Sequence, residues 1–163
     1  MTAVRWKPHV TVAALIAHEG RFLLVEERTA YGLQLNNPAG HLERGESLVQ
    51  ACVREVLEET AHHFTPEALV GVYMASSPAP QAGAPEVTYV RFAFTGRLGD
   101  KVPDRVLDAG IVRTVWLTAD EVRASAARHR SPLVLQDVED HLAGRRLPLE
   151  AIYTDPSVLH AAG

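Results

Sequence analysis

The sequence predicts one α+β domain in which a mixed β-sheet is sandwiched between helices. The domain spans residues 1–163, with its core at about 9–145. Two observations lead to this fold class. Apolar, strand-like segments occur both before and after the clearest amphipathic helix, and two further helices follow the last strand. The segments lack regular βαβ alternation, which favours a mixed sheet covered by helices.

The expected strands are short and are bounded by turn residues. Residues 9–17 are apolar on both alternating faces, as in a strand that is covered on both sides. Gly20 turns the chain into a hairpin partner at 21–27. A short strand or loop is expected at 34–40, a loop at 99–110, and further strands at 68–76, 87–97 and 111–117.

The clearest helix is expected at 47–61. Ser47 and Gln50 have the spacing of a capping box, and an apolar stripe that includes Cys52 recurs at helical spacing. Two more helices close the domain. The first is expected at about 118–127, and the second from Ser131, where proline at the next position suits the first helical turn.

Composition and charge exclude several classes of protein. Hydrophobic residues make up 47% of the chain and charged residues 22%, which is a globular composition. A net charge of −4 without any Lys/Arg run argues against a nucleic-acid polymer or an anionic membrane as partner. The N-terminal segment lacks a secretory signal, and the single cysteine cannot form an internal disulfide. We therefore expect a cytoplasmic monomer or homodimer that acts on a small molecule.

Three glutamates share one face of the 47–61 helix. Glu55, Glu58 and Glu59 stand at positions i, i+3 and i+4, well away from the apolar stripe. Each like-charged pair costs a few tenths of a kcal/mol, and a hard cation such as Mg²⁺ would relieve that repulsion. A merely solvated acidic face has the same pattern, so the helix alone leaves both interpretations open.

The surrounding spacing resembles a known motif. Residues 40–62 match the Nudix box, G-x5-E-x7-R-E-U-x-E-E-x-G-U with U aliphatic, at Gly40, Glu46, Arg54, Glu55, Val56, Glu58 and Glu59. Ala61 and His62 depart from the last two motif positions, which puts the geometry of the helix end in doubt. Beyond the box, segments such as NNPAGHLE and RSPLVLQDVEDHLAGRRLPLEAI are similar to the NudJ-type phosphatases of this family.

The resemblance implies the Nudix fold and a Mg²⁺-dependent hydrolase, with Mn²⁺ also possible. Such enzymes cleave phosphoric anhydride bonds of nucleoside tri- and diphosphates, or of a related pyrimidine pyrophosphate, by attack of water. The implied direct metal ligands are Glu55, Glu59 and Gly40 through its carbonyl, and Glu58 is implied to ligate directly or through water. The implied role of Arg54 is to orient the glutamates by pairing with Glu46 or Glu55.

The general base and the substrate contacts stay open at this level. The base is either a glutamate of the box, Glu55 or Glu58, or an aspartate of the 99–110 loop, Asp104 or Asp108. Arg28 and Arg91 are candidates for binding phosphate, although each could equally be an ordinary arginine. The aromatic side chains that could contact a base are His9, Tyr31, His41 and Tyr89.

Two alternative functions remain within this fold. One is a pyrophosphatase of ADP-ribose or of a modified dNTP, and the other is a non-catalytic module that binds a nucleotide. An isomerase of isopentenyl diphosphate is rejected, because that chemistry needs a cysteine in the pocket and Cys52 belongs to the apolar stripe.

Overall fold

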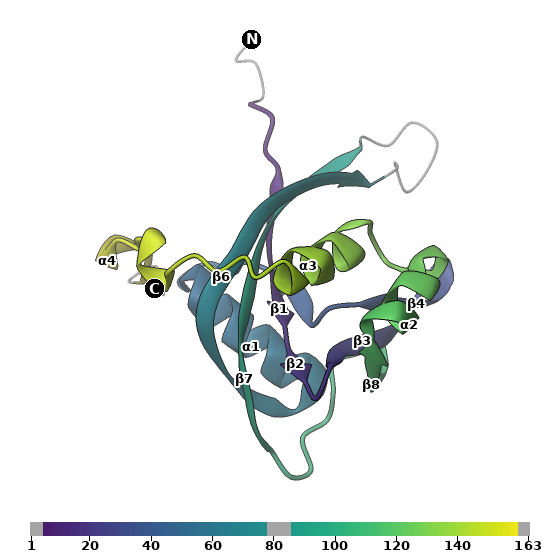
Figure 1. Ribbon diagram of the computed structural model, residues 1–163. Coiled ribbons are helices and arrows are strands. Elements are labelled where there is room, and N and C mark those ends of the chain that lie inside the picture. The colour runs from purple at the N-terminus through teal and green to yellow at the C-terminus, as the bar shows by residue number, and fades with distance from the viewer. Residues whose placement is uncertain (1–4, 78–85, 160–163) are drawn as a thin grey trace.

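The computed structural model describes residues 5–77 and 86–159 (Figure 1). The first four residues of the N-terminal segment considered above therefore lie outside the described part of the chain. None of the helices in the described ranges is long and apolar enough to cross a membrane.

A mixed four-stranded sheet forms the centre of the fold, in the order β5-β1-β7-β6. Strand β1 (His9–Leu15) runs parallel to β7 (Val87–Lys101) and antiparallel to β5 (Ala39–His41). The long strand β6 (His62–Ser77) pairs antiparallel with β7. Because β1 and β7 are parallel while their outer neighbours are antiparallel, the sheet is mixed, as predicted.

A second sheet is built around β3 (Arg21–Thr29), which pairs antiparallel with three short strands. These are β2 (Ala17–His18), β4 (Gly32–Asn36) and β8 (Ile111–Thr118). Pairing with β8 shifts register between Glu26 and Glu27, at the end of β3 nearest the loop before β8. The loop between β7 and β8 therefore lies beside the second sheet at the Glu27 end of β3.

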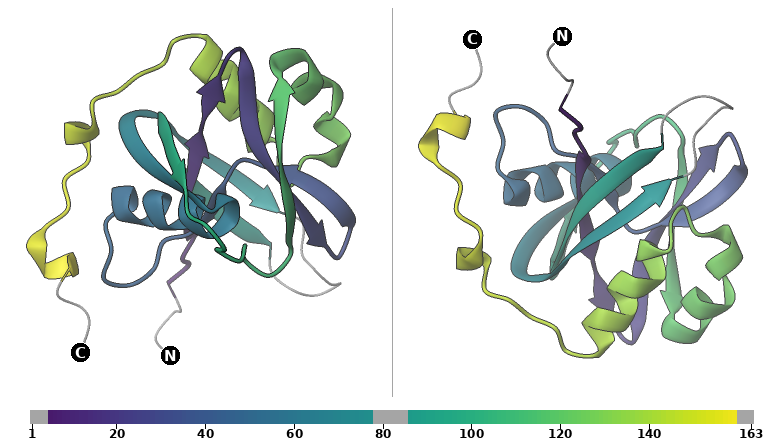
Figure 2. Two further views of the ribbon diagram at one scale, coloured as in Figure 1. Left: turned by 90° about the horizontal axis from the view of Figure 1, so that it is seen from below. Right: turned by 90° about the horizontal axis from the view of Figure 1, so that it is seen from above.

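Helices cover both faces of the central sheet. Helix α1 (Leu48–Thr60) packs Cys52 and Val56 into one core cluster with alternate residues of β1, including Val12. The intervening residues of β1 face a second cluster, which contains Val138 of α3 (Leu133–Leu142). Figure 2 shows these two helices on opposite sides of the β6–β7 ribbon. The predicted α/β/α layering is therefore confirmed.

The ends of α1 have the local structures that its sequence requires. Ser47 accepts a hydrogen bond from the Gln50 backbone N–H, and the Gln50 side chain accepts one from the Ser47 N–H, so the predicted capping box is present. At the other end, Ala61 has φ of 60° and ψ of 22°, in the left-handed region that usually takes glycine. The helix still ends where the family motif ends it, and Ala61 accepts the unfavourable backbone conformation.

Several predicted boundaries are wrong by a few residues. Strand β6 begins at His62 rather than 68, because register shifts between Pro66 and Ala68 let proline lie within the pairing. Strand β7 continues to Lys101 and so shortens the expected 99–110 loop.

The C-terminal helices are also shorter than expected. Helix α2 (Ala119–Ala124) ends early and gives way to a 3₁₀ turn, η1 (Ala126–Arg128), while α3 starts at Leu133 instead of Ser131. After α3 the described residues form a 3₁₀ turn, η2 (Leu149–Ala151), and the short α4 (Pro156–Leu159).

Candidate active site

The acidic face of α1 lies against the short strand β5. Glu55 and Glu59 are each only 8% exposed, although both side chains are ionisable. The Ala39 N–H donates a hydrogen bond of 2.9 Å to Glu59 Oε2. Glu55 packs directly on Gly40, where a β-carbon would lie 2.0 Å from Glu55 Oε1. Only glycine fits at position 40, because any side chain there would displace the Glu55 carboxylate.

Arg54 is the centre of a network that holds the glutamates in place. Its guanidinium donates to both carboxylate oxygens of Glu46, with Nε–Oε2 and Nη2–Oε1 distances of 3.0 and 2.7 Å. Nη1 also donates to Glu55 Oε1 and Glu58 Oε2, each at 2.9 Å. Nη2 donates to the His41 carbonyl at 2.9 Å, which ties the loop before α1 to the helix. Arg54 therefore contacts both of the partners expected for it, and Glu58 as well.

The acidic face has more negative than positive charge. One guanidinium faces three carboxylates in the Arg54 network. Burial raises the pKa of Glu59 to about 8, the Ala39 N–H lowers it, and the nearby charges of Glu55, Glu27 and Asp108 raise it further. Burial likewise raises the pKa of Glu55. A positive charge placed beside these groups would stabilise their ionised forms.

The donor set fits a hard cation by its chemistry. The carboxylates and the backbone carbonyl of Gly40 supply only oxygen, which Mg²⁺ and Mn²⁺ favour over sulfur or imidazole ligands. In the described ranges, no three His, Cys, Asp or Glu side chains converge on one point as they stand. Instead, Glu55 and Glu58 are directed at Arg54, and Glu59 at the Ala39 N–H.

The loop after β7 brings one aspartate beside this cluster. The Asp108 N–H donates to the Glu58 carbonyl at 3.0 Å, and its charge acts on Glu55 and Glu59. Arg105 holds the same loop by donating from Nε to the Leu57 carbonyl at 3.1 Å. Asp104 has φ of 57° and is exposed. Of the two loop aspartates considered from the sequence, Asp108 is the one with contacts to the acidic helix.

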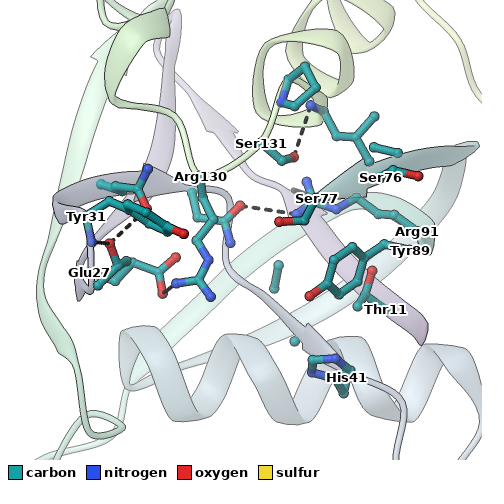
Figure 3. A pocket seen from close by; sticks show the side chains of 18 of the residues that line it. Thr11, Glu27, Tyr31, His41, Ser76, Ser77, Tyr89, Arg91, Arg130 and Ser131 are labelled. Carbon is teal, nitrogen blue, oxygen red and sulfur yellow. Dashed lines mark hydrogen bonds and ion pairs between the residues drawn. The ribbon is translucent and has the colours of Figure 1, made fainter. Parts of the chain in front are cut away.

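A pocket of about 800 Å³ opens on the other side of Gly40 (Figure 3). Its walls come from β3, β4, β5, β6, β7 and the segment before α3. Glu27 and Arg130 lie on one side, while His41 and Tyr89 line the opposite wall. The backbone of Ala39 and Gly40 separates this pocket from the buried glutamates. A ligand in the pocket thus lies next to the acidic face.

The predicted substrate-binding residues all line this pocket, but in different states. Arg28 is exposed there. Arg91 is buried, and its guanidinium donates to Asp137 Oδ2 at 2.9 Å and to Asn36 Oδ1 at 3.2 Å. Arg91 is therefore already engaged by groups of the protein, which its sequence position did not indicate.

Aromatic rings gather at the end of the pocket beside β1 and β5. His9 Nδ1 lies 3.3 Å from His41 Nε2, and the ring centre of Tyr89 lies 5.7 Å from that of His9 and 6.1 Å from that of His41. Burial lowers the pKa of His41, and the charges of His9 and Arg130 add to this effect. His41 is thus favoured as a neutral ring near neutral pH. Tyr31 lines the pocket from the β3–β4 turn.

Sequence reasoning missed Glu27, Arg130 and Ser131 as pocket residues. In the sequence, Glu27 belongs to an expected strand and Ser131 begins an expected helix, while Arg130 belongs to no expected element. Their proximity depends on the chain returning across β4 after η1, where the Arg130 N–H donates to the Leu35 carbonyl at 2.9 Å. The one local indication of a pocket here is the pair of polar residues, Arg130 and Ser131, directly before a helix.

The mixed sheet has helices on both faces, and the glutamates of α1 pack against Gly40 of β5. This is the arrangement expected of a Nudix hydrolase. The NUDIX domain model matches residues 7–137, which is most of the chain. The chain therefore belongs to the Nudix family, and the predicted family, fold and hydrolase class are confirmed.

Two groups of relatives make the comparison more specific. The chain is 37% identical over 147 residues to the protein named Phosphatase NudJ in Escherichia coli K12 and in Shigella flexneri. Each alignment covers 90% of this chain and 92% of the relative. A NUDIX hydrolase from Nitrosomonas europaea is 50% identical, with a TM-score of 0.84 and coverage of 91% of this chain and 98% of that one. A MutT NUDIX hydrolase from Burkholderia pseudomallei, at 19% identity, TM-score 0.65 and coverage of 83% and 98%, shares the fold.

Proposed function

We propose that this hydrolase cleaves phosphoric anhydride bonds of nucleoside tri- and diphosphates, or of a related pyrimidine pyrophosphate, with Mg²⁺ or Mn²⁺. One observation carries the proposal. The buried carboxylates of α1 and the pocket meet at the same two residues, Ala39 and Gly40. Similarity to the phosphatases named NudJ over most of the chain supports the same reaction class.

Gly40, through its carbonyl, Glu55 and Glu59 are the proposed direct metal ligands, and Glu58 is proposed to reach the metal through a bound water. A bound divalent cation supplies charge neutralisation at the phosphate oxygens and makes a bound water more acidic. The protein prepares this site in two ways. Arg54 fixes the positions of Glu55 and Glu58, and the Ala39 N–H fixes that of Glu59. Loss of either contact is expected to misplace a ligand oxygen.

Glu58 is the proposed general base, which takes a proton from the attacking water. Its side chain is 26% exposed, against 10% for Glu55, so water can reach it more easily. Arg54 holds one oxygen of Glu58, and the other is not engaged by Arg54. Asp108 is the alternative base, because its backbone is fixed to α1 at Glu58 and its charge lies near the cluster.

The base of the substrate is proposed to lie at the aromatic end of the pocket. His41 and Tyr89 line that wall, with His9 packed against both, and rings of this kind stack on bases by about 1–3 kcal/mol each. In this arrangement the phosphates extend toward Gly40 and the arginines. Arg28 and Arg91 are the proposed phosphate-side cations, with Arg91 held rigid by Asp137.

Product analysis tests this proposal directly. The purified protein is incubated with nucleoside di- and triphosphates, a pyrimidine pyrophosphate, ADP-ribose and modified dNTPs, each with Mg²⁺, with Mn²⁺ and with excess EDTA. We expect orthophosphate from the nucleoside diphosphates and no turnover in EDTA. Release of AMP from ADP-ribose alone, or of pyrophosphate from dNTPs alone, would favour the first alternative function. No turnover of any substrate would favour the binding module.

A further inference from the structure

An ion pair crosses the pocket between Arg130 and Glu27. Arg130 Nη1 donates to Glu27 Oε2 at 2.9 Å, and Figure 3 shows the arginine reaching across from the segment before α3. The side chains are 48% and 16% exposed, so the guanidinium is open to solvent on the pocket side while the carboxylate is mostly covered. Within the described part of the chain, Glu27 Oε1 is buried and lacks a hydrogen-bond partner.

The backbone of Arg130 is fixed on both sides. Its N–H is bound to the Leu35 carbonyl of β4, and three and four residues later Leu133 and Val134 are buried, at 8% and 0% exposure. The Cα position is therefore set by the sheet and by the core, while the side chain extends over open pocket. A long cationic side chain on a fixed backbone is suited to binding a ligand at a defined position.

Two arginines of the pocket, Arg91 and Arg130, differ in how freely they can bind a phosphate. Arg91 is 8% exposed at its side chain and is shared between Asp137 and Asn36. Arg130 is half-exposed and has one carboxylate partner in the described structure. A terminal phosphate carries more negative charge than one carboxylate, and a guanidinium binds it through two parallel hydrogen bonds. Exchange of partner is thus favourable at Arg130, whereas Arg91 can act on a phosphate only while it remains paired with Asp137.

From this geometry we infer that Arg130 contacts the substrate phosphates, and that Glu27 is the partner that its guanidinium gives up when they bind. The inference rests on the proposed function, because it takes a nucleotide phosphate as the ligand. On binding, Arg130 moves its hydrogen bonds from Glu27 Oε2 to phosphate oxygens. Arg130 is then a binding residue for the phosphate end, opposite the aromatic wall of His41 and Tyr89.

Arg128 supplies a matched control. It belongs to the same segment, is 49% exposed, and pairs with Glu26, the neighbour of Glu27 in β3. Arg128 does not line the pocket, so Arg128→Gln removes an ion pair of the same segment without touching the binding site, and Glu26 keeps its second partner, Arg113. Arg130→Lys retains the positive charge but loses the two-pronged geometry.

The experiment measures binding and turnover separately. Affinity for α,β-methylene-ADP with Mg²⁺ is measured by calorimetry, and KM and kcat for ADP by orthophosphate release. For Arg130→Gln we expect affinity to fall and KM to rise by about 10- to 100-fold, with kcat changed less than about 3-fold. Arg130→Lys should recover part of the loss, and Arg128→Gln should bind as the wild type does. Glu27→Gln should bind equally well or up to about 5-fold more tightly, since the competing carboxylate is gone.

The outcomes separate this inference from the proposed function. Wild-type binding of the analogue together with equal binding by Arg130→Gln overturns the role of Arg130 alone. An equal loss in Arg128→Gln, or in Glu27→Gln, also overturns it, because the ion pairs would then act only on the fold. A wild type that neither binds the analogue nor hydrolyses any nucleotide overturns the proposed function, and this inference with it.

Discussion

Glu59 on α1 and Asp137 on α3 are both buried carboxylates, on helices that cover opposite faces of the same sheet. Burial raises the pKa of both groups, to about 8 for Glu59 and to about 6 for Asp137. Their partners differ. Asp137 is completely buried and receives the Arg91 guanidinium at 2.9 Å, whereas Glu59 receives one backbone N–H and faces other carboxylates.

The two sites therefore differ in charge balance. The α3 site contains its own cation, so its charges are balanced when the chain folds. The α1 site gathers Glu55, Glu59 and Asp108 without a matching number of cations, which stability alone does not favour. An excess of buried negative charge beside a pocket therefore points to a positive ligand from outside. The comparison predicts that substitutions at α3 affect stability first and substitutions at α1 affect activity first.

Asp137→Ala is expected to lower the free energy of unfolding by about 3–5 kcal/mol, because it leaves the buried Arg91 without its carboxylate. Urea unfolding at pH 7 measures the change. Asp137→Asn is the matched variant, since it keeps the side-chain volume and one acceptor for Arg91, and a smaller loss is expected for it. A loss below about 1 kcal/mol for Asp137→Ala would show that the pair contributes little and would remove the contrast with α1.

Glu59→Gln is expected to lower activity while leaving stability almost unchanged. The change removes a carboxyl group whose ionisation the burial and the neighbouring carboxylates disfavour, and the Gln oxygen can still accept from the Ala39 N–H, so the Tm of the metal-free protein should stay the same or rise slightly. Hydrolysis should fall by at least about 100-fold in kcat/KM, or some 2.7 kcal/mol of transition-state stabilisation, since a proposed metal ligand loses its charge. Near-wild-type activity on every nucleotide would indicate that the acidic face of α1 binds no catalytic metal.

Glu58→Gln compared with Asp108→Asn locates the base within the α1 region. Removal of a general base typically costs about 10²–10⁴-fold in rate, and we expect a loss of about 100-fold in kcat for Glu58→Gln only. Metal affinity, measured by titration of activity with Mg²⁺, controls for damage to the metal site. A comparable loss in Asp108→Asn with unchanged metal affinity would transfer the role to the loop.

The acidic site on α1 could be predicted from the sequence because its parts are close along the chain. The glutamates and Arg54 share one helix, and Gly40 and Glu46 lie just before it, so spacing alone indicates a common face. The capping box at Ser47 follows from the same local rules, but the helix end at Ala61 does not, because local preference favours glycine in the left-handed conformation that Ala61 adopts. The main strands were also indicated by their apolar pattern, except where bulges carried β6 across Pro66.

The pocket could not be predicted in the same way, because its walls come from distant parts of the chain. Glu27 and Arg130 are more than 100 residues apart in sequence, and no periodicity links them. The same holds for Arg91 and Asp137, which are 46 residues apart and meet through the packing of α3 on the sheet. Arg91 was therefore assigned as a pocket cation without any sign that a buried aspartate holds it.

A smaller effect on stability is expected from His141, at the end of α3 away from the pocket. His141 lies within α3, where Nε2 is 2.9 Å from the Arg146 guanidinium and 3.1 Å from Thr95 Oγ1. Burial lowers the pKa of His141 to about 4, and the Arg146 charge adds to the effect. In the unfolded chain the imidazole has its ordinary pKa of about 6.5. The unfolded state thus binds more protons between these two values.

Because the unfolded state takes up the extra proton, the contribution of His141 is fully present above pH 6.5. It is lost progressively as the pH falls toward 4. Asp137, whose pKa is raised to about 6, acts in the opposite direction over much of the same range, so the wild-type curve alone does not isolate His141. The measurement is therefore a difference between the wild type and His141→Gln, each unfolded in urea at pH 7 and pH 5. After allowance for solvent screening, we expect the wild type to lose about 1 kcal/mol more than the variant over this interval. Equal losses would mean that Arg146 does not hold the imidazole neutral, while hydrolysis measured at pH 7 should be the same for both proteins.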